Sequence, residues 1–286
     1  MKMKKLGAIA ASFAVLGALA LTGCGGSGSA STAASGSDAG SASASGSEVK
    51  LVKDGTLTVG MSADYEPFEY MEGDDYKGFD VELAQAIGEK LGYKVEFANV
   101  DFDSIVAGVA SGTKYDVGMS AITVTPERKK EVDFSDSYYM DDQAIVTNKT
   151  NTAVTGDNYT DELNKEGVKI AVQSGSTAES FAKENFPKAE LVPFKNAVDC
   201  FSALQANGSD SADKPVAVVT NRSVAAQMVA QQFSEQQVVK LISTGEEYAI
   251  AVSKDNSALK GKIDDALKEL TDDGTVDQLM AKYNIK

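Results

Sequence analysis

Hydrophobic and polar positions follow two alternating periods along the chain after residue 55. Residues 56–61 alternate as a short strand. Apolar side chains then recur every four positions over 79–91, which predicts a helix that ends at Gly92. The next predicted elements are a strand over 94–97, a helix over 103–109 that Asp103 caps, and a strand over 115–119. Strand, helix and strand in short succession indicate a right-handed, parallel α/β layer.

The same succession of elements restarts after residue 167. Strands are predicted over 168–172, 191–194, 216–219 and 248–252, and helices over 177–186, 199–206, 223–232 and 259–270. Two α/β units of similar order predict two lobes, and 286 residues suffice for about two domains of roughly 150 residues. Such sheets bind small ligands outside the carboxyl ends of their strands, so site residues are expected in the loops that follow them.

The first 48 residues differ in composition from the rest of the chain. Residues 1–23 begin with lysines and continue as an apolar run too short for a membrane span of about 20 residues, which indicates a signal peptide. The sequence LTGC at 21–24 resembles a bacterial lipobox, which implies cleavage before Cys24 and its acylation by lipid, including palmitate. An ordinary signal peptide with a chance cysteine is the alternative. Residues 24–48, almost entirely Gly, Ser, Ala and Thr after the cysteine, predict a flexible tether.

The net charge and the missing residue types exclude several classes of function. A formal net charge of −15 repels phosphate backbones and anionic lipids, which argues against nucleic-acid binding and leaves the N-terminal lipid as the expected membrane contact. The chain has no histidine, which excludes Ser-His-Asp and Cys-His catalysis and His-ligated metal sites. No metal and no cofactor are therefore expected. Cys200 is predicted to be a buried apolar thiol, although a disulfide with Cys24 is arithmetically possible.

Five short motifs carry a family resemblance. They are YEPFEY at 65–70, GFDVEL at 78–83, VDF at 100–102, SAITVTPER at 120–128 and VDFSDSY at 132–138. Together they closely resemble the amino-acid-binding proteins of ABC importers, which form family 3 of the bacterial extracellular solute-binding proteins. The resemblance extends from about residue 50 to the C-terminus. It implies an α/β, two-lobed periplasmic-binding-protein-like fold of type II, in which each lobe is a mixed sheet flanked by helices and a two-segment hinge joins the lobes.

The expected domain boundaries follow from the same resemblance. Lobe 1 is expected to comprise 49–145 and 246–286, and lobe 2 is expected to comprise 146–245. The last strand and helices therefore return to the first lobe. The hinge is expected to run through about 142–149 and 242–247.

The loop over 120–128 contains the donors that the resemblance assigns to the ligand α-carboxylate. Arg128 has a planar guanidinium that can hold a carboxylate through two parallel hydrogen bonds, although such an arginine is also a common surface ion-pair partner. The hydroxyl of Thr123 and the backbone amides near Ala121 and Thr123 add further donors. The residues implied in this loop are Ser120, Ala121, Thr123 and Arg128.

Aromatic rings and a second polar turn complete the implied site. Tyr65 and Phe102 match positions whose rings sandwich the ligand side chain from the first lobe, and core packing is the alternative. Gln173, Ser176 and Thr177 lie in a turn that opens a helix, where free amides and the positive end of the helix dipole are available. The resemblance implies that this turn meets the carboxylate from the second lobe. Ser176 or Thr177 can also be a plain N-cap.

Two positions depart from the family pattern. Asn221, which follows a predicted loop insertion over 209–214, stands where an aspartate commonly pairs with the ligand α-ammonium, and Ser62 stands where many relatives have an early aspartate. An asparagine still accepts a hydrogen bond but gives up the charge assistance that makes such bonds roughly twice as strong. Either Asp64 or Glu179 compensates, or the amine of the ligand is modified or weakly held.

The sequence therefore predicts a receptor for a small amino-acid-like ligand, lipid-anchored at the outer face of the cell membrane. It is expected to be a monomer that serves an ABC permease and its ATPase. One alternative is a ligand-sensing lipoprotein that feeds no transporter. Another is an enzyme on the same fold, such as a dehydratase or a transglycosylase, which needs an acid beside the substrate; Glu66 and Asp64 are the candidates.

Overall fold

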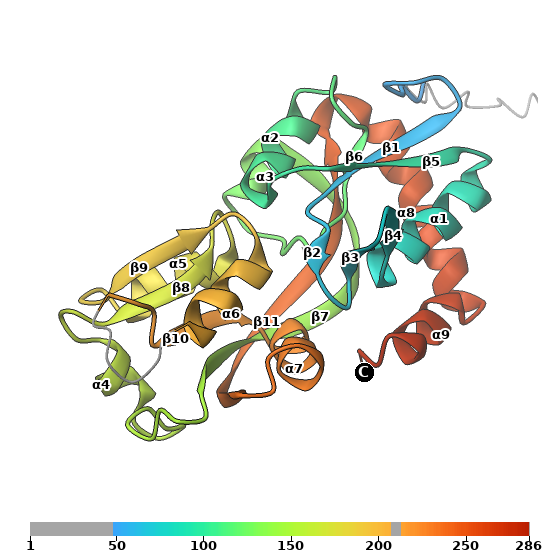
Figure 1. Ribbon diagram of the computed structural model, residues 1–286. Helices are drawn as coiled ribbons and strands as arrows, with labels where there is room; N and C mark the ends of the chain where they lie inside the picture. The colour runs from blue at the N-terminus through green and yellow to red at the C-terminus, as the bar shows by residue number, and fades with distance from the viewer. Residues whose placement is uncertain (1–47, 207–212, 286) are drawn as a thin grey trace, which may run out of the picture. The chain divides into compact units, whose positions relative to one another are not determined.

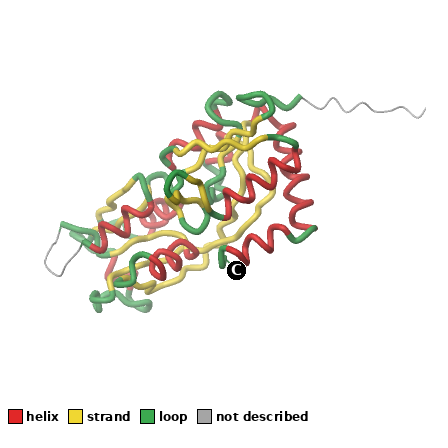
Figure 2. Tube along the Cα trace, turned by 45° about the vertical axis from the view of Figure 1, so that its right-hand side comes forward, coloured by secondary structure: helices red, strands yellow, loops and turns green. Residues whose placement is uncertain are grey.

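The computed structural model describes residues 48–206 and 213–285. Eight of the strands in these residues form one mixed sheet (Figure 1). In sheet order the strands are β5 (Lys94–Asn99), β1 (Thr56–Met61), β6 (Val117–Gly118), β11 (Gln236–Ser253), β7 (Val132–Asn148), β10 (Ala217–Asn221), β8 (Lys169–Gln173) and β9 (Glu190–Phe194). Helices flank this sheet (Figure 2). The predicted signal peptide, Cys24 with its tether, and most of the predicted insertion over 209–214 lie outside the described residues.

The first half of the molecule is built on β5, β1 and β6, which pair in parallel. It also contains the small sheet β2 (Asp64–Tyr65), β3 (Glu69–Glu72) and β4 (Asp75–Lys77), and the helices α1 (Phe79–Leu91), α2 (Ile105–Ala110), α3 (Arg128–Glu131), α8 (Ser257–Asp272) and α9 (Thr275–Lys282), with the 3-10 turns η1 (Phe102–Ser104) and η2 (Lys254–Asn256). Helix α1 confirms the predicted stripe, because Phe79, Leu83 and Ile87 are buried. Gly92 ends it in left-handed backbone with φ 72°.

The second half is built on β10, β8 and β9, which are also parallel. Its helices are α4 (Tyr159–Leu163), α5 (Thr177–Asn185), α6 (Ala197–Gln205) and α7 (Arg222–Gln231). The strands and helices predicted between 168 and 232 are thus confirmed to within a few residues. Cys200 is buried in α6 with a free thiol, as predicted.

The helix predicted over 103–109 begins later than expected. The turn η1 precedes α2, and neither has a side-chain cap. The expectation that Asp103 caps this helix is wrong, because its carboxylate accepts a hydrogen bond from the Ser174 hydroxyl at 3.1 Å instead. Ser174 belongs to the second half, so Asp103 joins the two halves.

Strands β7 and β11 are long and belong to both halves (Figure 1). They run antiparallel along each other over nearly their whole length. The sequence pattern predicts only 248–252 within β11 and misses β7, whose 17 residues mix apolar, polar and acidic side chains without a regular period. The hinge segments predicted over 142–149 and 242–247 fall almost entirely within these two strands.

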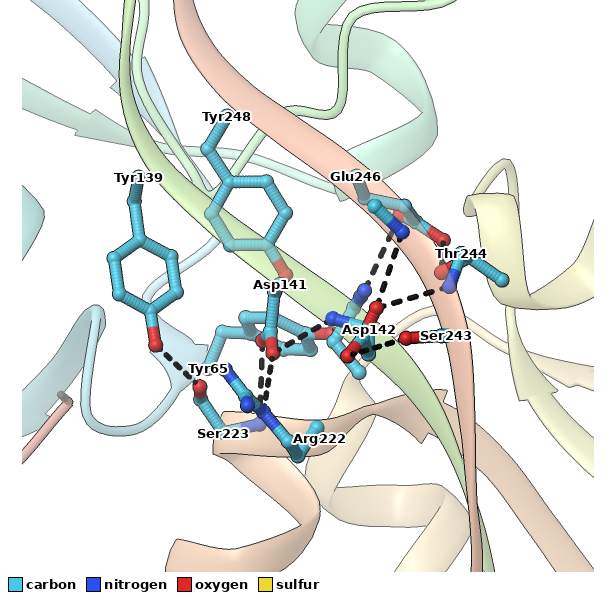
Figure 3. A network of polar contacts seen from close by, with 12 residues as sticks. Tyr65, Tyr139, Asp141, Asp142, Arg222, Ser223, Ser243, Thr244, Glu246 and Tyr248 are labelled. Atoms are coloured by element: carbon cyan, nitrogen blue, oxygen red, sulfur yellow. Dashed lines mark hydrogen bonds and ion pairs between the residues drawn. The ribbon is translucent and has the colours of Figure 1, made fainter.

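A bulge interrupts the pairing of β11 with β7. The register advances by four positions on β11, from Ile242 to Glu246, while β7 advances by two. Asp142 Oδ1 holds the extra residues by accepting the amide hydrogens of Thr244 at 2.9 Å and of Gly245 at 3.1 Å (Figure 3). Bulges of this kind re-aim the side chains that follow them. Here the bulge directs Glu246 inward, where it is 9% exposed.

Candidate ligand-binding site

Residues predicted for the site from both lobes meet where the two halves face each other. Tyr65 donates its hydroxyl hydrogen to Asn221 Oδ1 at 2.7 Å and lies 3.3 Å from the Thr220 hydroxyl. Asn221 ends β10 in the second half, so this contact joins the halves. Burial raises the pKa of Tyr65 above its ordinary value, which keeps the phenol protonated as a donor.

Arg128 begins α3 in the first half and reaches the second half. Its Nη1 donates to the carbonyl of Thr123 at 2.7 Å, and its Nη2 donates to the carbonyl of Gly175 at 3.0 Å. Its Cζ lies 5.4 Å from the centre of the Phe102 ring. None of the ion pairs between described residues includes Arg128, so its guanidinium keeps donors for another acceptor. Burial lowers the pKa of Arg128, and the negative charge of Glu246 opposes that shift.

A pocket of about 290 Å³ opens beside this guanidinium. Phe102, Ile122 and Arg128 line it from the first half, and Gly175 lines it from the second. Gly175 has φ 74°, and a Cβ there would lie 2.8 Å from the Cβ of Asp103. Only glycine therefore lets this turn approach the first half so closely. The pocket offers a ring face and a cation at the boundary between the halves.

Glu246 is a buried acid of the candidate site for which neither the sequence pattern nor the family resemblance implies a role. Its Oε2 accepts hydrogen bonds from the hydroxyls of Thr123 and Thr177, both at 2.7 Å, and from Asn221 Nδ2 at 3.2 Å. Gln143 Nε2 donates to its Oε1 at 2.5 Å. Three predicted site residues from both halves thus converge on one carboxylate. The side chain of Glu246 extends from β11 directly after the bulge (Figure 3).

The two acids expected to compensate for Asn221 bond elsewhere. Asp64 accepts the backbone amide of Ala197 at 2.5 Å at the start of α6, and Glu179 accepts a backbone amide of its own turn at 2.7 Å. The acid that contacts Asn221 is Glu246. Sequence periodicity could not point to it, because the bulge decides which way this side chain faces.

The turn before α5 combines a capping residue with a residue that faces the site. Ser176 Oγ accepts the amide hydrogen three residues further on at 3.0 Å, which confirms the plain N-cap interpretation for this residue. Thr177 directs its hydroxyl to Glu246 instead. Gln173 Nε2 donates to the carbonyl of Lys195 at 3.3 Å and thus bonds within the second half.

Ser120 and Ala121 turn towards the core of the first half. The Ser120 hydroxyl donates to Glu69 Oε1 at 2.7 Å, and the Ala121 amide donates to Asp80 Oδ2 at 2.8 Å. The donors expected to bind the ligand carboxylate at these two positions are therefore used by inner acids. Both acids are almost fully buried. Burial raises the pKa of Glu69, where the charge of Asp80 adds to the effect, and it raises the pKa of Asp80 to about 6.

We expect these two inner acids to make the protein less stable as the pH rises. An unfolded carboxyl loses its proton near pH 4, whereas the folded pKa of Asp80 is about 6. The folded state therefore holds protons that the unfolded state has lost, so the free energy of unfolding should fall between about pH 4 and pH 7. Glu69→Gln removes one of these two carboxyls with a raised pKa and should raise stability at neutral pH by about 1–3 kcal/mol.

Denaturant unfolding over this pH window measures the effect. The matched control is Glu72→Gln, which removes an exposed carboxylate from the same strand, β3. Glu69→Gln should flatten the pH dependence, while Glu72→Gln should leave it as in the wild type. Identical slopes in the two variants would contradict the assignment of the effect to the buried pair.

The acids considered for an enzyme on this fold have partners in the other half. Glu66 accepts hydrogen bonds from Gln227 at 2.8 Å and from Gln232 at 2.9 Å. Asp64 binds the start of α6 through Ala197, and burial raises its pKa to about 6. Both carboxylates therefore link the halves through direct hydrogen bonds.

A second polar network fixes α7 to the central strands (Figure 3). Asp141 forms an ion pair with Arg222 Nε at 3.1 Å and accepts the backbone amide of Ser223 at 3.2 Å. The Tyr248 hydroxyl donates to it at 3.3 Å, and the hydroxyls of Tyr139 and Ser223 lie 2.8 Å apart. Burial raises the pKa of Asp141 despite these partners. The network lies directly beside the bulge that presents Glu246.

The fold and this candidate site are those of one class of protein: an α/β solute-binding protein, here with the candidate site between two halves that long strands join. Residues 57–286 match the family model of the bacterial extracellular solute-binding proteins, family 3. The chain belongs to this family, which is extracytoplasmic. In the part of the chain with described structure, no helix has the length and apolarity to cross a bilayer.

Two curated relatives show the breadth of the family. The arginine-binding extracellular protein ArtP of Bacillus subtilis is 38% identical over 230 residues, which are 79% of this chain and 85% of that protein. The ABC transporter glutamine-binding protein GlnH of the same organism is 30% identical over 212 residues, which are 73% of each chain.

Solved structures confirm the predicted fold class. An ancestral arginine-binding protein bound to arginine is 39% identical, with a TM-score of 0.73, over 80% of this chain and 98% of that chain. An ancestral amino-acid-binding protein described as a precursor of cyclohexadienyl dehydratase is also 39% identical, with a TM-score of 0.72, over 80% of this chain and 95% of that chain.

Proposed function

We propose that this chain is the extracytoplasmic receptor of an ABC importer and that it binds a free amino acid between its two halves. The observation that carries the proposal is the guanidinium of Arg128. Carbonyl groups from both halves hold it, and it has no ion-pair partner within the described residues. A partly buried cation that no counter-ion contacts is costly, and a ligand carboxylate would supply that contact. The names of the relatives, arginine-binding and glutamine-binding proteins, support an amino acid as the ligand.

The chemistry of the site suits this ligand. The planar fork of Arg128 matches an α-carboxylate through two parallel hydrogen bonds. The hydroxyls of Thr123 and Thr177 lie close by from opposite halves, since both bond to the same carboxylate oxygen of Glu246. The ring of Phe102 and the adjoining pocket offer an apolar face to the ligand side chain.

We propose further that the two halves act as lobes, over 49–145 with 246–286 and over 146–245. Hinge motion in β7 and β11, at about 142–149 and 242–247, would open them. The contacts that join the halves would break on opening, among them Tyr65–Asn221, Asp103–Ser174, Glu66–Gln227 and the ion pair of Lys195 with Asp101. A ligand that bridges both lobes shifts the equilibrium towards the closed form.

The anchoring and the partners also belong to the proposal. A lipid on Cys24, followed by the flexible tether, would keep the receptor near a permease and its ATPase. The receptor is proposed to be a monomer. The name of GlnH, an ABC transporter protein, supports import over a purely sensory role. Binding is proposed in preference to catalysis, because Glu66 and Asp64 use their carboxylates to join the halves. Uptake of labelled amino acid in cells that lack this protein separates import from sensing.

The test of the binding proposal is a melting-temperature screen of the full chain against free amino acids and their decarboxylated amines. Arginine is compared with agmatine, and glutamine with 4-aminobutanamide, so each pair differs only in the α-carboxylate. A ligand at 100 times its dissociation constant should stabilise the protein by about 2.7 kcal/mol, which gives a clear shift.

We expect an amino acid to shift the melting temperature and its amine to leave it unchanged. An amine that stabilises the protein as much as the parent amino acid would contradict the carboxylate role of Arg128. If no free amino acid shifts the melting temperature, the proposed ligand class is wrong.

A further inference from the structure

Glu246 is a buried carboxylate that the protein surrounds with hydrogen-bond donors but pairs with no cation. It is 9% exposed, and hydroxyls of Thr123 and Thr177 and amides of Asn221 and Gln143 donate to it. None of the ion pairs between residues of the described ranges includes it. Burying an ionised carboxylate is unfavourable unless an opposite charge accompanies it. No cation of the described residues contacts this carboxylate, so a positively charged donor placed against it would stabilise it.

Gln143 places a second unsatisfied acceptor beside Glu246. Its side chain is fully buried, and its Nε2 donates to Glu246 and to the Thr177 hydroxyl at 3.3 Å. Its Oε1 has no hydrogen-bond partner within the described chain. Buried amide oxygens are nearly always hydrogen-bonded, so this atom also requires a donor. An ammonium group has several N–H donors and no acceptor, and it can satisfy both residues at once.

Asn221, which stands where the family resemblance implies an aspartate opposite the ligand ammonium, has both ends of its amide engaged. Its Oδ1 accepts the hydroxyl hydrogen of Tyr65 at 2.7 Å, and its Nδ2 donates to Glu246 at 3.2 Å. The amide is neutral and turns its donor towards the carboxylate. The negative charge in this part of the site therefore comes from β11 and not from the end of β10.

We propose that Glu246, with the side-chain oxygen of Gln143 beside it, binds the α-ammonium group of the amino acid. The inference rests on the proposed function. Thr123 sets the spacing, because its carbonyl accepts from Arg128 and its hydroxyl donates to Glu246. Thr123 therefore contacts both the guanidinium of Arg128 and the carboxylate of Glu246. In the same way, the α-carbon of an amino acid carries both its carboxylate and its ammonium group. A ligand whose carboxylate meets Arg128 directs its ammonium to Glu246, whereas a side-chain cation lies several bonds farther away.

The test uses titration calorimetry on the full chain with ligands that differ only in the α-amino group. Arginine is compared with 5-guanidinopentanoate, and glutamine with glutaramate. Glu246→Gln should weaken binding of the amino acid by about 100-fold and change binding of the desamino acid by less than about threefold. Glu247→Gln removes the same charge from the exposed neighbour on the same strand, and should change neither.

A charge-transfer variant sharpens the test and guards against a misfolded single variant. Asn221→Asp combined with Glu246→Gln returns one carboxylate to the site, and should recover at least about tenfold in amino-acid affinity over Glu246→Gln, with no gain for the desamino acid. Equal losses for amino acid and desamino acid in Glu246→Gln overturn the inference. Equal affinity of the wild type for the amino acid and the desamino acid also overturns the inference, and this measurement requires no variant.

The failure of this inference is distinguishable from failure of the proposed function. A wild type that binds an amino acid, with Glu246→Gln binding it equally well, overturns the role of Glu246 alone. A wild type that binds neither arginine, glutamine nor any other free amino acid overturns the proposed function, and the role of Glu246 with it.

Discussion

Replacing Arg128 by alanine is expected to weaken amino-acid binding by about a hundredfold or more. The substitution removes a bidentate, charge-assisted contact with the ligand carboxylate, and each such hydrogen bond contributes about 1.5–3 kcal/mol. The protein itself should remain folded, because the guanidinium of Arg128 donates to two backbone carbonyls, of Thr123 and Gly175, at the edge of a pocket that water can enter. Calorimetric titration with arginine or glutamine measures the loss.

Two further variants separate geometry from charge at this position. Arg128→Lys keeps the positive charge but loses the planar fork, and is expected to bind about tenfold more weakly than the wild type. Lys129→Ala removes a cation from the exposed neighbouring position of α3 and should bind as the wild type does. If Arg128→Ala and Lys129→Ala have the same affinity, Arg128 does not bind the ligand carboxylate.

Replacing Phe68 by alanine is expected to lower the free energy of unfolding by about 3–5 kcal/mol. Phe68 is 0% exposed, and its ring lies 5.2 Å from that of Tyr139 and 5.4 Å from that of Tyr248, which belong to the two long central strands. It also contacts the rings of Phe79 and Tyr65. Alanine would leave a cavity between α1, the small sheet and the central strands, and it would remove the support of the Tyr65 ring.

Urea unfolding of the full chain measures this loss. Phe68→Leu retains most of the volume and should cost about 1 kcal/mol, so it serves as the conservative control. We also expect Phe68→Ala to weaken ligand binding more than Phe68→Leu does, because Tyr65 is held in place by this ring. If Phe68→Ala lowers the free energy of unfolding by less than Phe68→Leu does, the aromatic rings around Phe68 contribute little to the stability of the core.

The predictability of the fold differs between its regular and its central elements. Helix α1 is evident from the sequence because one apolar stripe and Gly92 coincide with its packed face and its end. Strand β7 has no such pattern, since it lies between two other strands and alternates between core, site and interface along its length. Because the buried side chains of β7 lie on different faces along its length, apolar residues do not recur at every second position, which is the pattern that identifies an ordinary strand.

The predictability of the site follows the same division. Tyr65 lies in the short strand β2, and Arg128 and Thr177 begin helices. Local motifs identify all three, and the structure brings them to the boundary between the halves. Glu246 is aimed by a bulge that depends on pairing with a strand about a hundred residues away in sequence, between residues 246 and 141. Ser120 follows its motif but faces an inner acid, Glu69, whose burial no local pattern reveals.

The central position of β11 sets the order in which the chain can fold. This strand lies between β6 and β7, and β6 pairs with Ala251 and Val252. A chain made from its N-terminus therefore cannot complete this sheet until β11 has been synthesised through Ser253. Any shorter nascent chain presents the edges of β6 and β7 unpaired, which invites aggregation unless a chaperone covers them. The eight-stranded sheet can therefore close only after β11 has been made, although β11 lies at its centre.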